Sequence, residues 1–170
     1  MLFGVAGISV ALDQWTKWLV RTNIEYSGQW LPDWLNWLSP YARIVHWYNS
    51  GAAFGMFQNG NLIFTILAFV VIAAILYYFP SVDSDDWTLK LAMGLQLGGA
   101  VGNLIDRLIM QKVTDFISIW TFPVFNIADA SISVGVAVLL LGVWLKEREE
   151  ELKAAQVKTE DAPETMKEGS

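Results

Sequence analysis

The sequence predicts an all-α membrane protein with four transmembrane helices. Of its 170 residues, 54% are hydrophobic and only 16% are charged. A soluble domain of this size has too small an interior to bury that much apolar surface, so the excess requires lipid as a second solvent. The apolar residues gather into four segments, each close to the roughly 20 residues that a helix needs to cross the hydrocarbon core. These segments cover residues 2–20, 62–79, 88–110 and 127–145.

The first segment, residues 2–20, carries Asp13 and Lys17 in its last third. A cleaved signal peptide is the alternative interpretation, but it would need basic residues at its start and a small-residue cleavage site, and this segment has neither. The second segment is the clearest span, because it contains no charged residue and ends before Pro80. The two later segments are also apolar, with polar residues near one end of each.

The distribution of basic residues predicts the orientation. Four spans place both termini on the same side, and basic residues gather on the cytoplasmic side of membrane proteins. The C-terminal tail contains five of them: Lys146, Arg148, Lys153, Lys158 and Lys167. We therefore expect cytoplasmic termini, a membrane domain over residues 1–148, a disordered tail over residues 149–170 and an extracytoplasmic loop over residues 21–61. The short loop from Ser81 to Asp86 would then be cytoplasmic although it is acidic.

The loop over residues 21–61 is too polar to span a membrane and too aromatic to be a simple linker. Residues 30–38 read WLPDWLNWL, and indole rings favour the membrane interface, so this stretch predicts an interfacial helix or loop. Residues 43–48 are rich in β-branched and aromatic side chains, which predicts a short strand. The small-residue run Asn49–Gly55 fits either the start of a helix or a place where a peptide backbone lies close to the protein.

Four aspartates lie in or beside the apolar segments: Asp13, Asp106, Asp115 and Asp129. A charge at the centre of a membrane helix costs about 2.5–3.5 kcal/mol, so such residues are usually functional. The alternative is that each is a wet, structural residue at the interface. With four spans, all four aspartates lie at the same membrane face. Thirteen residues including Pro123 separate Asp115 from Asp129, enough for a reversal that brings these two together.

Neighbouring residues support this polar cluster. Three pairs are spaced to share a helix face: Asp13 with Lys17, Asn103 with Asp106, and Asn126 with Asp129. The glycines of Gly98–Gly102 form a G-x-x-x-G pattern, which lets helix backbones approach closely in lipid. This pattern fits either a tight crossing that holds the polar cluster or ordinary packing of membrane helices.

Two neighbouring carboxyl groups cannot easily both ionise, so one of them keeps a proton near neutral pH. The ionised member can take a proton from water while the protonated member polarises a carbonyl, which hydrolyses a peptide bond without a metal. Cysteine is absent and His46 is the only histidine, which argues against thiolate and zinc sites. The sequence also has no basic patch, which argues against nucleic-acid binding. The residues alone leave a paired-acid hydrolase and a proton-coupled carrier open.

Five short motifs resemble, in the same order, the conserved blocks of the lipoprotein signal peptidase family. They are Asp13–Lys17 (DQWTK), Asn49–Gly55 (NSGAAFG), Gly98–Arg107 (GGAVGNLIDR), Val113–Phe116 (VTDF) and Phe125–Asp129 (FNIAD). Each block alone is a weak signal, but five in order on a four-helix hydropathy profile favour the hydrolase. Four spans without an inverted repeat also make a poor transporter.

The resemblance implies an intramembrane aspartyl endopeptidase (signal peptidase II) of the bacterial cytoplasmic membrane, acting without a metal or other cofactor. Its substrates would be diacylglyceryl-modified prolipoproteins in membrane lipid, cut just before the lipidated cysteine, and we expect a monomer. Asp115 and Asp129 match the family's catalytic pair. The positions that match substrate-binding or supporting residues are Asn49, Gly99, Asn103, Arg107, Asn126 and Ala128, and those that match structural polar residues are Asp13, Lys17 and Asp106. The resemblance also implies a small extracytoplasmic β-sheet cradle and a mobile cover within residues 21–61.

Overall fold

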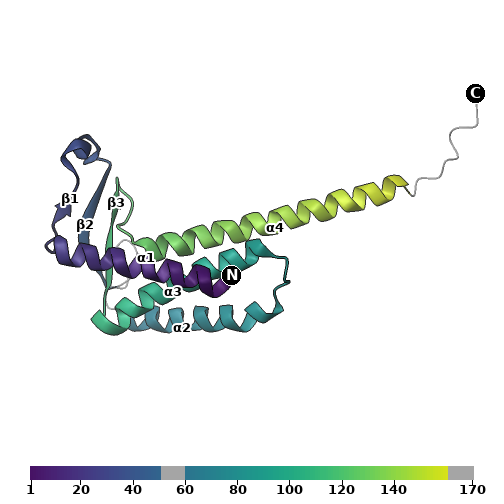
Figure 1. The fold of residues 1–170 in the computed structure, drawn as a ribbon, viewed down its shortest axis with the longest axis horizontal. Coiled ribbons are helices and arrows are strands. Elements are labelled where there is room, and N and C mark those ends of the chain that lie inside the picture. The colour runs from purple at the N-terminus through teal and green to yellow at the C-terminus, as the bar shows by residue number, and fades with distance from the viewer. Residues whose placement is uncertain (51–59, 161–170) are drawn as a thin grey trace, which may run out of the picture.

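The computed structural model describes residues 1–50 and 60–160. Four long helices lie alongside one another, and a small sheet stands across one end of the bundle (Figure 1). The helices are α1 (Leu2–Asn23), α2 (Asn61–Tyr78), α3 (Trp87–Met110) and α4 (Ile127–Glu160). The strands are β1 (Gln29–Trp30), β2 (Ala42–Asn49) and β3 (Val113–Ile119), and short 3-10 helices cover Asp33–Leu38 and Phe79–Ser81.

Within the described residues, two helical segments are long and apolar enough to cross a membrane. They are Asn61–Ser81, which contains α2, and Ile127–Gln156 of α4. Only 11% and 17% of their most apolar windows are buried inside the protein, whereas the core helix of a soluble protein would be mostly buried. Their exposed apolar faces therefore need lipid. The other two predicted spans carry buried charged residues toward their C-terminal ends, which are Asp13 and Lys17 in α1 and Asp106 in α3.

Helix α3 lies at the centre of the bundle, and its glycines allow the other helices to come close. A Cβ atom added at Gly98 would lie 2.6 Å from the Cβ of Ser9 on α1, and one at Gly102 would lie 2.7 Å from Oδ2 of Asp13. At Gly99, an added Cβ would collide with the carbonyl oxygen of Ala128 on α4. The predicted close crossing thus joins three helices, and it does so beside the polar residue Asp13.

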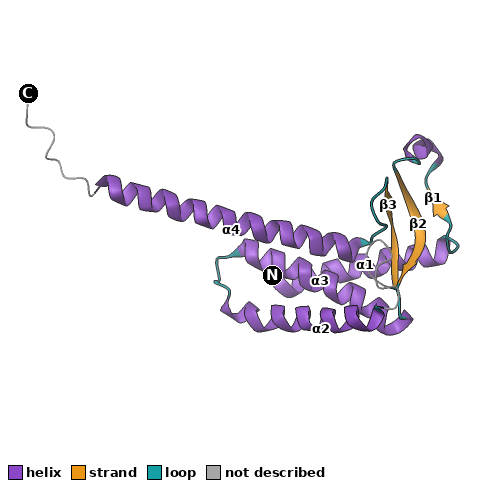
Figure 2. Cartoon of the chain, turned by 180° about the vertical axis from the view of Figure 1, so that it is seen from behind, coloured by secondary structure: helices purple, strands orange, loops and turns teal. Residues whose placement is uncertain are grey.

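The three strands form an antiparallel sheet in the order β1–β2–β3 (Figure 2). Strand β2 confirms the strand predicted over residues 43–48, and its register places Trp47 opposite Asp115 of β3. The tryptophan-rich stretch predicted to be interfacial includes a 3-10 helix, in which Trp34 and Trp37 are 76% and 69% exposed. Such exposed indole rings suit a membrane interface.

Residues 149–160, which the sequence predicts to be disordered, continue helix α4 beyond the other helices (Figure 1). Lys153 lies one turn after Glu149 and pairs with it at 2.6 Å, and this segment is rich in the good helix formers Glu, Lys and Ala. Residues 161–170 and most of the small-residue run before α2, residues 51–55, lie outside the described residues.

Candidate active site

The chain reverses between Asp115 and Asp129, as predicted. Strand β3 carries Asp115, and after a turn the backbone N–H of Phe125 donates to the carbonyl of Ile117 over 3.1 Å. This return brings the first turn of α4, which carries Asp129, back beside β3. The two aspartates line one cavity of about 680 Å³. Asp115 is only 2% exposed, so its carboxyl group lies away from bulk water.

Asn126 lies between the two carboxyl groups and bonds to both. Its side-chain Nδ2 donates to Oδ1 of Asp115 over 2.7 Å, and its backbone N–H donates to Oδ2 of Asp129 over 3.3 Å. The N–H of Asp129 in turn donates to Oδ1 of Asn126 over 2.9 Å. This fully buried residue therefore positions Asp115 and Asp129 relative to each other.

Two further amides complete the hydrogen bonding of the pair. Nδ2 of Asn49, at the end of β2, donates to Oδ2 of Asp115 over 3.1 Å. Nδ2 of Asn103, on α3, donates to Oδ1 of Asp129 over 2.7 Å. Together with Asn126, these amides give each of the four carboxyl oxygens a donor. A buried carboxyl group needs such donors, because burial without them is strongly unfavourable.

Burial and the negative charge of Asp129 raise the pKa of Asp115 to about 7. The hydrogen bonds from Asn49 and Asn126 and the positive charge of Lys17 oppose this rise. Near neutral pH, Asp115 therefore readily holds a proton beside Asp129. This is the behaviour expected of two carboxyl groups that share a site.

The rest of the cavity wall is largely apolar and includes one cation. Phe64 of α2 and Val134 of α4 line it, together with Phe122 and Pro123 from the turn after β3. The Arg107 guanidinium lies over the Phe64 ring, 5.6 Å from its centroid, and also lines the cavity. The cavity thus combines a carboxyl pair with a surface suited to apolar groups.

Beneath the pair lies a buried ionic cluster, which confirms the predicted pairing of Asp13 with Lys17. The Lys17 Nζ atom is 2.8 Å from Oδ2 of Asp13 and 3.4 Å from Oδ2 of Asp106. Oδ1 of Asp13 accepts from the backbone N–H of Ala128, and Oδ2 of Asp106 accepts from that of Thr114. The cluster therefore ties α1 and α3 to the elements that carry Asp129 and Asp115.

Asn103 and Asp106 share a face of α3 as predicted, but they bond to different partners, Asp129 and Thr114 respectively. Gly99 and Ala128, expected to support the site, contact each other where α3 packs against α4.

Three residues of this region were missed by the sequence analysis: Gln14, Arg21 and Thr114. Nε2 of Gln14 donates to the carbonyl of Gly102 over 3.0 Å, and Arg21 donates to the Thr114 hydroxyl over 3.1 Å. Arg21 follows Lys17 by one helical turn, and this spacing could have predicted that both side chains lie on the same face of α1.

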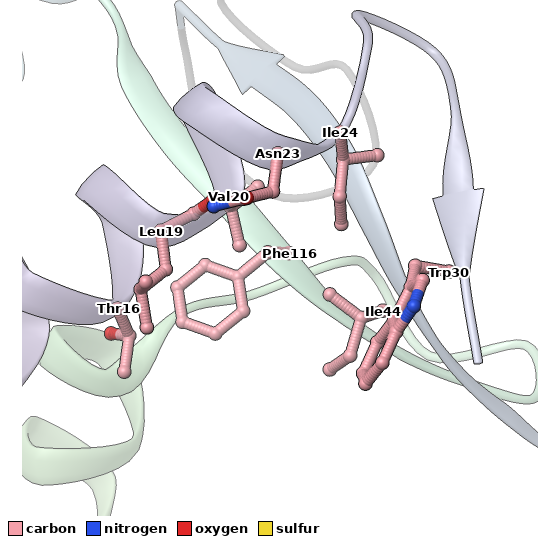
Figure 3. A pocket seen from close by; sticks show the side chains of 8 residues that line it. All are labelled: Thr16, Leu19, Val20, Asn23, Ile24, Trp30, Ile44 and Phe116. Carbon is pink, nitrogen blue, oxygen red and sulfur yellow. The ribbon is translucent and has the colours of Figure 1, made fainter. Parts of the chain in front are cut away.

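A second cavity, of about 620 Å³, lies on the opposite face of the sheet (Figure 3). The ring of Phe116 forms part of its wall, and neighbouring residues of a strand point to opposite faces, so Phe116 points away from the side of Asp115. The other described lining residues come from the end of α1 and from strands β1 and β2, and none of them is ionisable. Of these two cavities, the one lined by Asp115 and Asp129 is therefore the one that can support acid–base chemistry.

Among residues 1–50 and 60–160, no group of three or more His, Asp or Glu side chains is placed to hold a metal ion. The fold and the carboxyl pair define a helical membrane enzyme. Two solved structures, both titled bacterial membrane enzymes, share this fold. One has a TM-score of 0.74 at 29% identity and covers 86% of this chain and 88% of that one. The other has a TM-score of 0.70 at 29% identity and covers 82% and 89%.

The sequence comparisons are more specific. The family model described as signal peptidase (SPase) II matches residues 5–145. The lipoprotein signal peptidase of Shouchella clausii is 41% identical over 151 residues, covering 88% of this chain and 97% of that relative. That of Bacillus subtilis is 38% identical over 149 residues, covering 85% and 94%. The chain belongs to the signal peptidase II family and is a membrane-bound protease.

Proposed function

We propose that this protein is an intramembrane aspartyl endopeptidase that removes signal peptides from diacylglyceryl-modified prolipoproteins, cutting just before the lipidated cysteine. The observation that carries this proposal is the pair Asp115 and Asp129, which line one largely apolar cavity with a donor on every carboxyl oxygen. Relatives named lipoprotein signal peptidase support the substrate class.

The two carboxyl groups have different roles in this mechanism. Asp129 is the ionised base: it takes a proton from water as the water oxygen bonds to the scissile carbonyl carbon. Asp115 is the acid, protonated because its pKa is raised to about 7, and its proton goes to the carbonyl oxygen. The tetrahedral intermediate collapses when Asp129 gives its proton to the leaving nitrogen and the C–N bond breaks. The hydroxyl oxygen then returns its proton to Asp115, which restores the starting state.

The walls of the cavity indicate how a lipid-anchored substrate reaches this pair. Phe64 and Val134 belong to the two helices with the most exposed apolar faces, α2 and α4. Burial in lipid is worth about 0.8 kcal/mol per CH₂, so a diacylated cysteine does not leave the bilayer. The substrate therefore arrives sideways, between α2 and α4.

The proposed topology follows from this route. All four long helices cross the bacterial cytoplasmic membrane, both termini are cytoplasmic, and residues 1–148 form a monomeric peptidase domain. The sheet lies at the extracytoplasmic face. There, β2 and the other described residues of 21–50 form the cradle and cover of the site, since Trp47 of β2 pairs with Asp115.

Changing each aspartate to asparagine tests the mechanism. Asp115→Asn and Asp129→Asn keep the size of the side chain but remove the exchangeable acid proton. A catalytic pair acts as a unit, so each single change should remove nearly all cleavage of a lipidated prolipoprotein, and the double change should add little. Thermal stability in detergent should fall modestly, because the new NH₂ group faces an N–H donor and leaves one buried hydrogen bond unmade. Full cleavage by Asp115→Asn at wild-type stability would overturn the aspartyl mechanism and favour the carrier.

A further inference from the structure

Lys17 is fully buried, and three oxygen atoms lie close to its ammonium nitrogen. Its Nζ atom lies 2.8 Å from Oδ2 of Asp13, 3.0 Å from Oδ1 of Asn103 and 3.4 Å from Oδ2 of Asp106. An ammonium group has three donors and no acceptor, and its three oxygen partners match it in number and charge. Two of them are carboxylates of the ionic cluster, but the third is the amide that bonds to Asp129.

The hydrogen bond from Lys17 determines how the Asn103 amide is oriented. Oδ1 of Asn103 accepts from Lys17 over 3.0 Å and from Nδ2 of Asn126 over 3.1 Å. In the flipped orientation, the Asn103 NH₂ group would face two donors that cannot accept a hydrogen bond. The amide oxygen must therefore face Lys17. Nδ2 is left to donate to Oδ1 of Asp129 over 2.7 Å.

The charges around the pair also depend on Lys17. Three cations lie in and around the buried site, Lys17 and Arg21 from α1 and Arg107 from α3. Four carboxyl groups accompany them: Asp13 from α1, Asp106 from α3, Asp115 from β3 and Asp129 from α4. With one proton on Asp115, three cations balance three carboxylates, and the cluster is neutral. Without Lys17 it would carry a net negative charge, which favours a second proton on the pair.

We propose that Lys17 is a positioning residue for the reaction, which acts through Asn103 to keep Asp129 ionised as the base. This inference rests on the proposed function, because it assigns the base of the same carboxyl pair. It also goes beyond a structural role for the Asp13–Lys17 pair, because it predicts that the ionisation of the catalytic pair changes when Lys17 is replaced.

The pH dependence of cleavage separates these two roles. Lys17→Met removes the charge and the donor, so the pair binds its protons more tightly. The whole kcat/KM profile should move to higher pH by about one unit, the lower end of the effect of a nearby opposite charge. At an acidic pH, below both limbs of the bell-shaped pH profile, kcat/KM of the variant should therefore be about tenfold lower than that of the wild type. A structural defect would lower the profile without moving it along the pH axis.

Lys17→Gln is the second variant, because glutamine can still hydrogen-bond to Asp13 and so protects the fold. It too lacks the charge and should show the shift. Lys146→Met is the matched control: Lys146 also pairs with an aspartate, Asp86, at 2.6 Å, but this pair lies outside the cavity of Asp115 and Asp129. Its profile should coincide with that of the wild type.

An infrared titration of the protonated-carboxyl band gives a readout that needs no turnover. In the wild type, the band should disappear with rising pH at a midpoint that moves upward in Lys17→Met and Lys17→Gln. Unmoved profiles and midpoints in both variants would overturn the role of Lys17, while inactive Asp115→Asn and Asp129→Asn would leave the aspartyl mechanism standing. Full cleavage by Asp115→Asn would overturn both proposals.

Discussion

Asn126 and Asp129 bond to each other twice: the N–H of Asn126 donates to Oδ2 of Asp129 over 3.3 Å, and the N–H of Asp129 donates to Oδ1 of Asn126 over 2.9 Å. This is the reciprocal arrangement of a capping box, in which two otherwise unpaired donors at a helix start are satisfied. The proposed base is therefore part of the start of α4. The remaining Nδ2 of Asn126 donates to Asp115, so the same side chain also holds the proposed acid.

Asn126→Ser should separate these two roles. A serine hydroxyl can still cap α4 by accepting from the N–H of Asp129, so stability should stay within about 1 kcal/mol of the wild type. Serine lacks the Nδ2 donor to the protonated Asp115, and a hydrogen bond between neutral groups is worth about 0.5–1.5 kcal/mol, so kcat/KM should fall about two- to tenfold. Asn126→Ala should lose the cap as well. Thermal melting and prolipoprotein cleavage on the same preparations measure both effects, and wild-type cleavage by the serine variant would contradict this prediction.

The raised pKa of Asp115 predicts the alkaline limb of the pH profile. As the acid, Asp115 acts only when protonated, so kcat/KM should fall as pH rises through about 7. Asn49→Ala removes a hydrogen bond that lowers this pKa, so the pKa of Asp115 should rise and the limb should move to higher pH. Cleavage rates measured from about pH 5 to pH 9 test the shift. A limb that moves to lower pH would show that Asp115 is not the acid.

The helices and the carboxyl pair were predictable from the sequence for physical reasons. Long apolar runs have few stable alternatives to a helix in lipid, and the short interval between Asp115 and Asp129 allows only a tight reversal. Strand β3 was not predicted from its own residues, because Val113–Ile119 follows α3 almost at once and gains its strand pairing from β2, far away in sequence.

The contacts of Arg21 and the route from Lys17 to Asp129 were also beyond sequence reasoning. They depend on how α1 packs against α3 and α4, and that packing is set by glycine contacts between helices. The predicted span ends at Leu145 because the apolar residues end there. The helix itself continues, because the residues that follow are good helix formers.

Asp13→Asn should lower stability but leave residual cleavage. It removes one of the two carboxylates that pair with Lys17, and breaking a buried ion pair costs about 3–5 kcal/mol. The asparagine oxygen can still accept from the N–H of Ala128, so the start of α4 stays in place. Glu149→Gln is the control, because the pair of Glu149 with Lys153 is exposed and its loss should hardly change the melting temperature. Equal melting temperatures for the two variants would contradict a stabilising role of Asp13.

Gly99→Ala should be strongly destabilising. The added Cβ would collide with the carbonyl oxygen of Ala128, a backbone atom that cannot turn away, so α4 would have to move from α3. Overpacking of this kind typically costs about 1–3 kcal/mol, and the displaced α4 carries Asp129, so cleavage should fall too. Gly7→Ala is the matched control: nothing lies within 4 Å of a Cβ there, and alanine favours a helix. Thermal melting in detergent should therefore drop for Gly99→Ala alone, and equal melting of both variants would contradict the close contact.

The last prediction concerns Asp86, at the other end of α3. Its Oδ1 accepts from the backbone N–H of Leu89 over 3.0 Å, so Asp86 caps the helix, and Nζ of Lys146 on α4 donates to its Oδ2 over 2.6 Å. The hydrogen bond from Lys146 is the largest cause that lowers the pKa of Asp86 from 3.8 to about 2, and the bond from Leu89 adds to it. Ionised Asp86 therefore joins α3 to α4 as well as starting α3.

Because the pKa of Asp86 is lower in the folded state, its stabilising effect should be fully present above about pH 4 and lost as pH falls toward about 2. Asp86→Asn keeps an acceptor for Leu89 but loses the ion pair, which is worth about 1 kcal/mol at most because the Lys146 side chain is 56% exposed. Asp86→Ala should lose about 1 kcal/mol more with the cap. Melting temperatures in detergent across this pH range should show the gap between wild type and Asp86→Asn closing as pH falls. If this difference in melting temperature stays constant from neutral pH to about 2, the ion pair of Asp86 with Lys146 does not stabilise the fold.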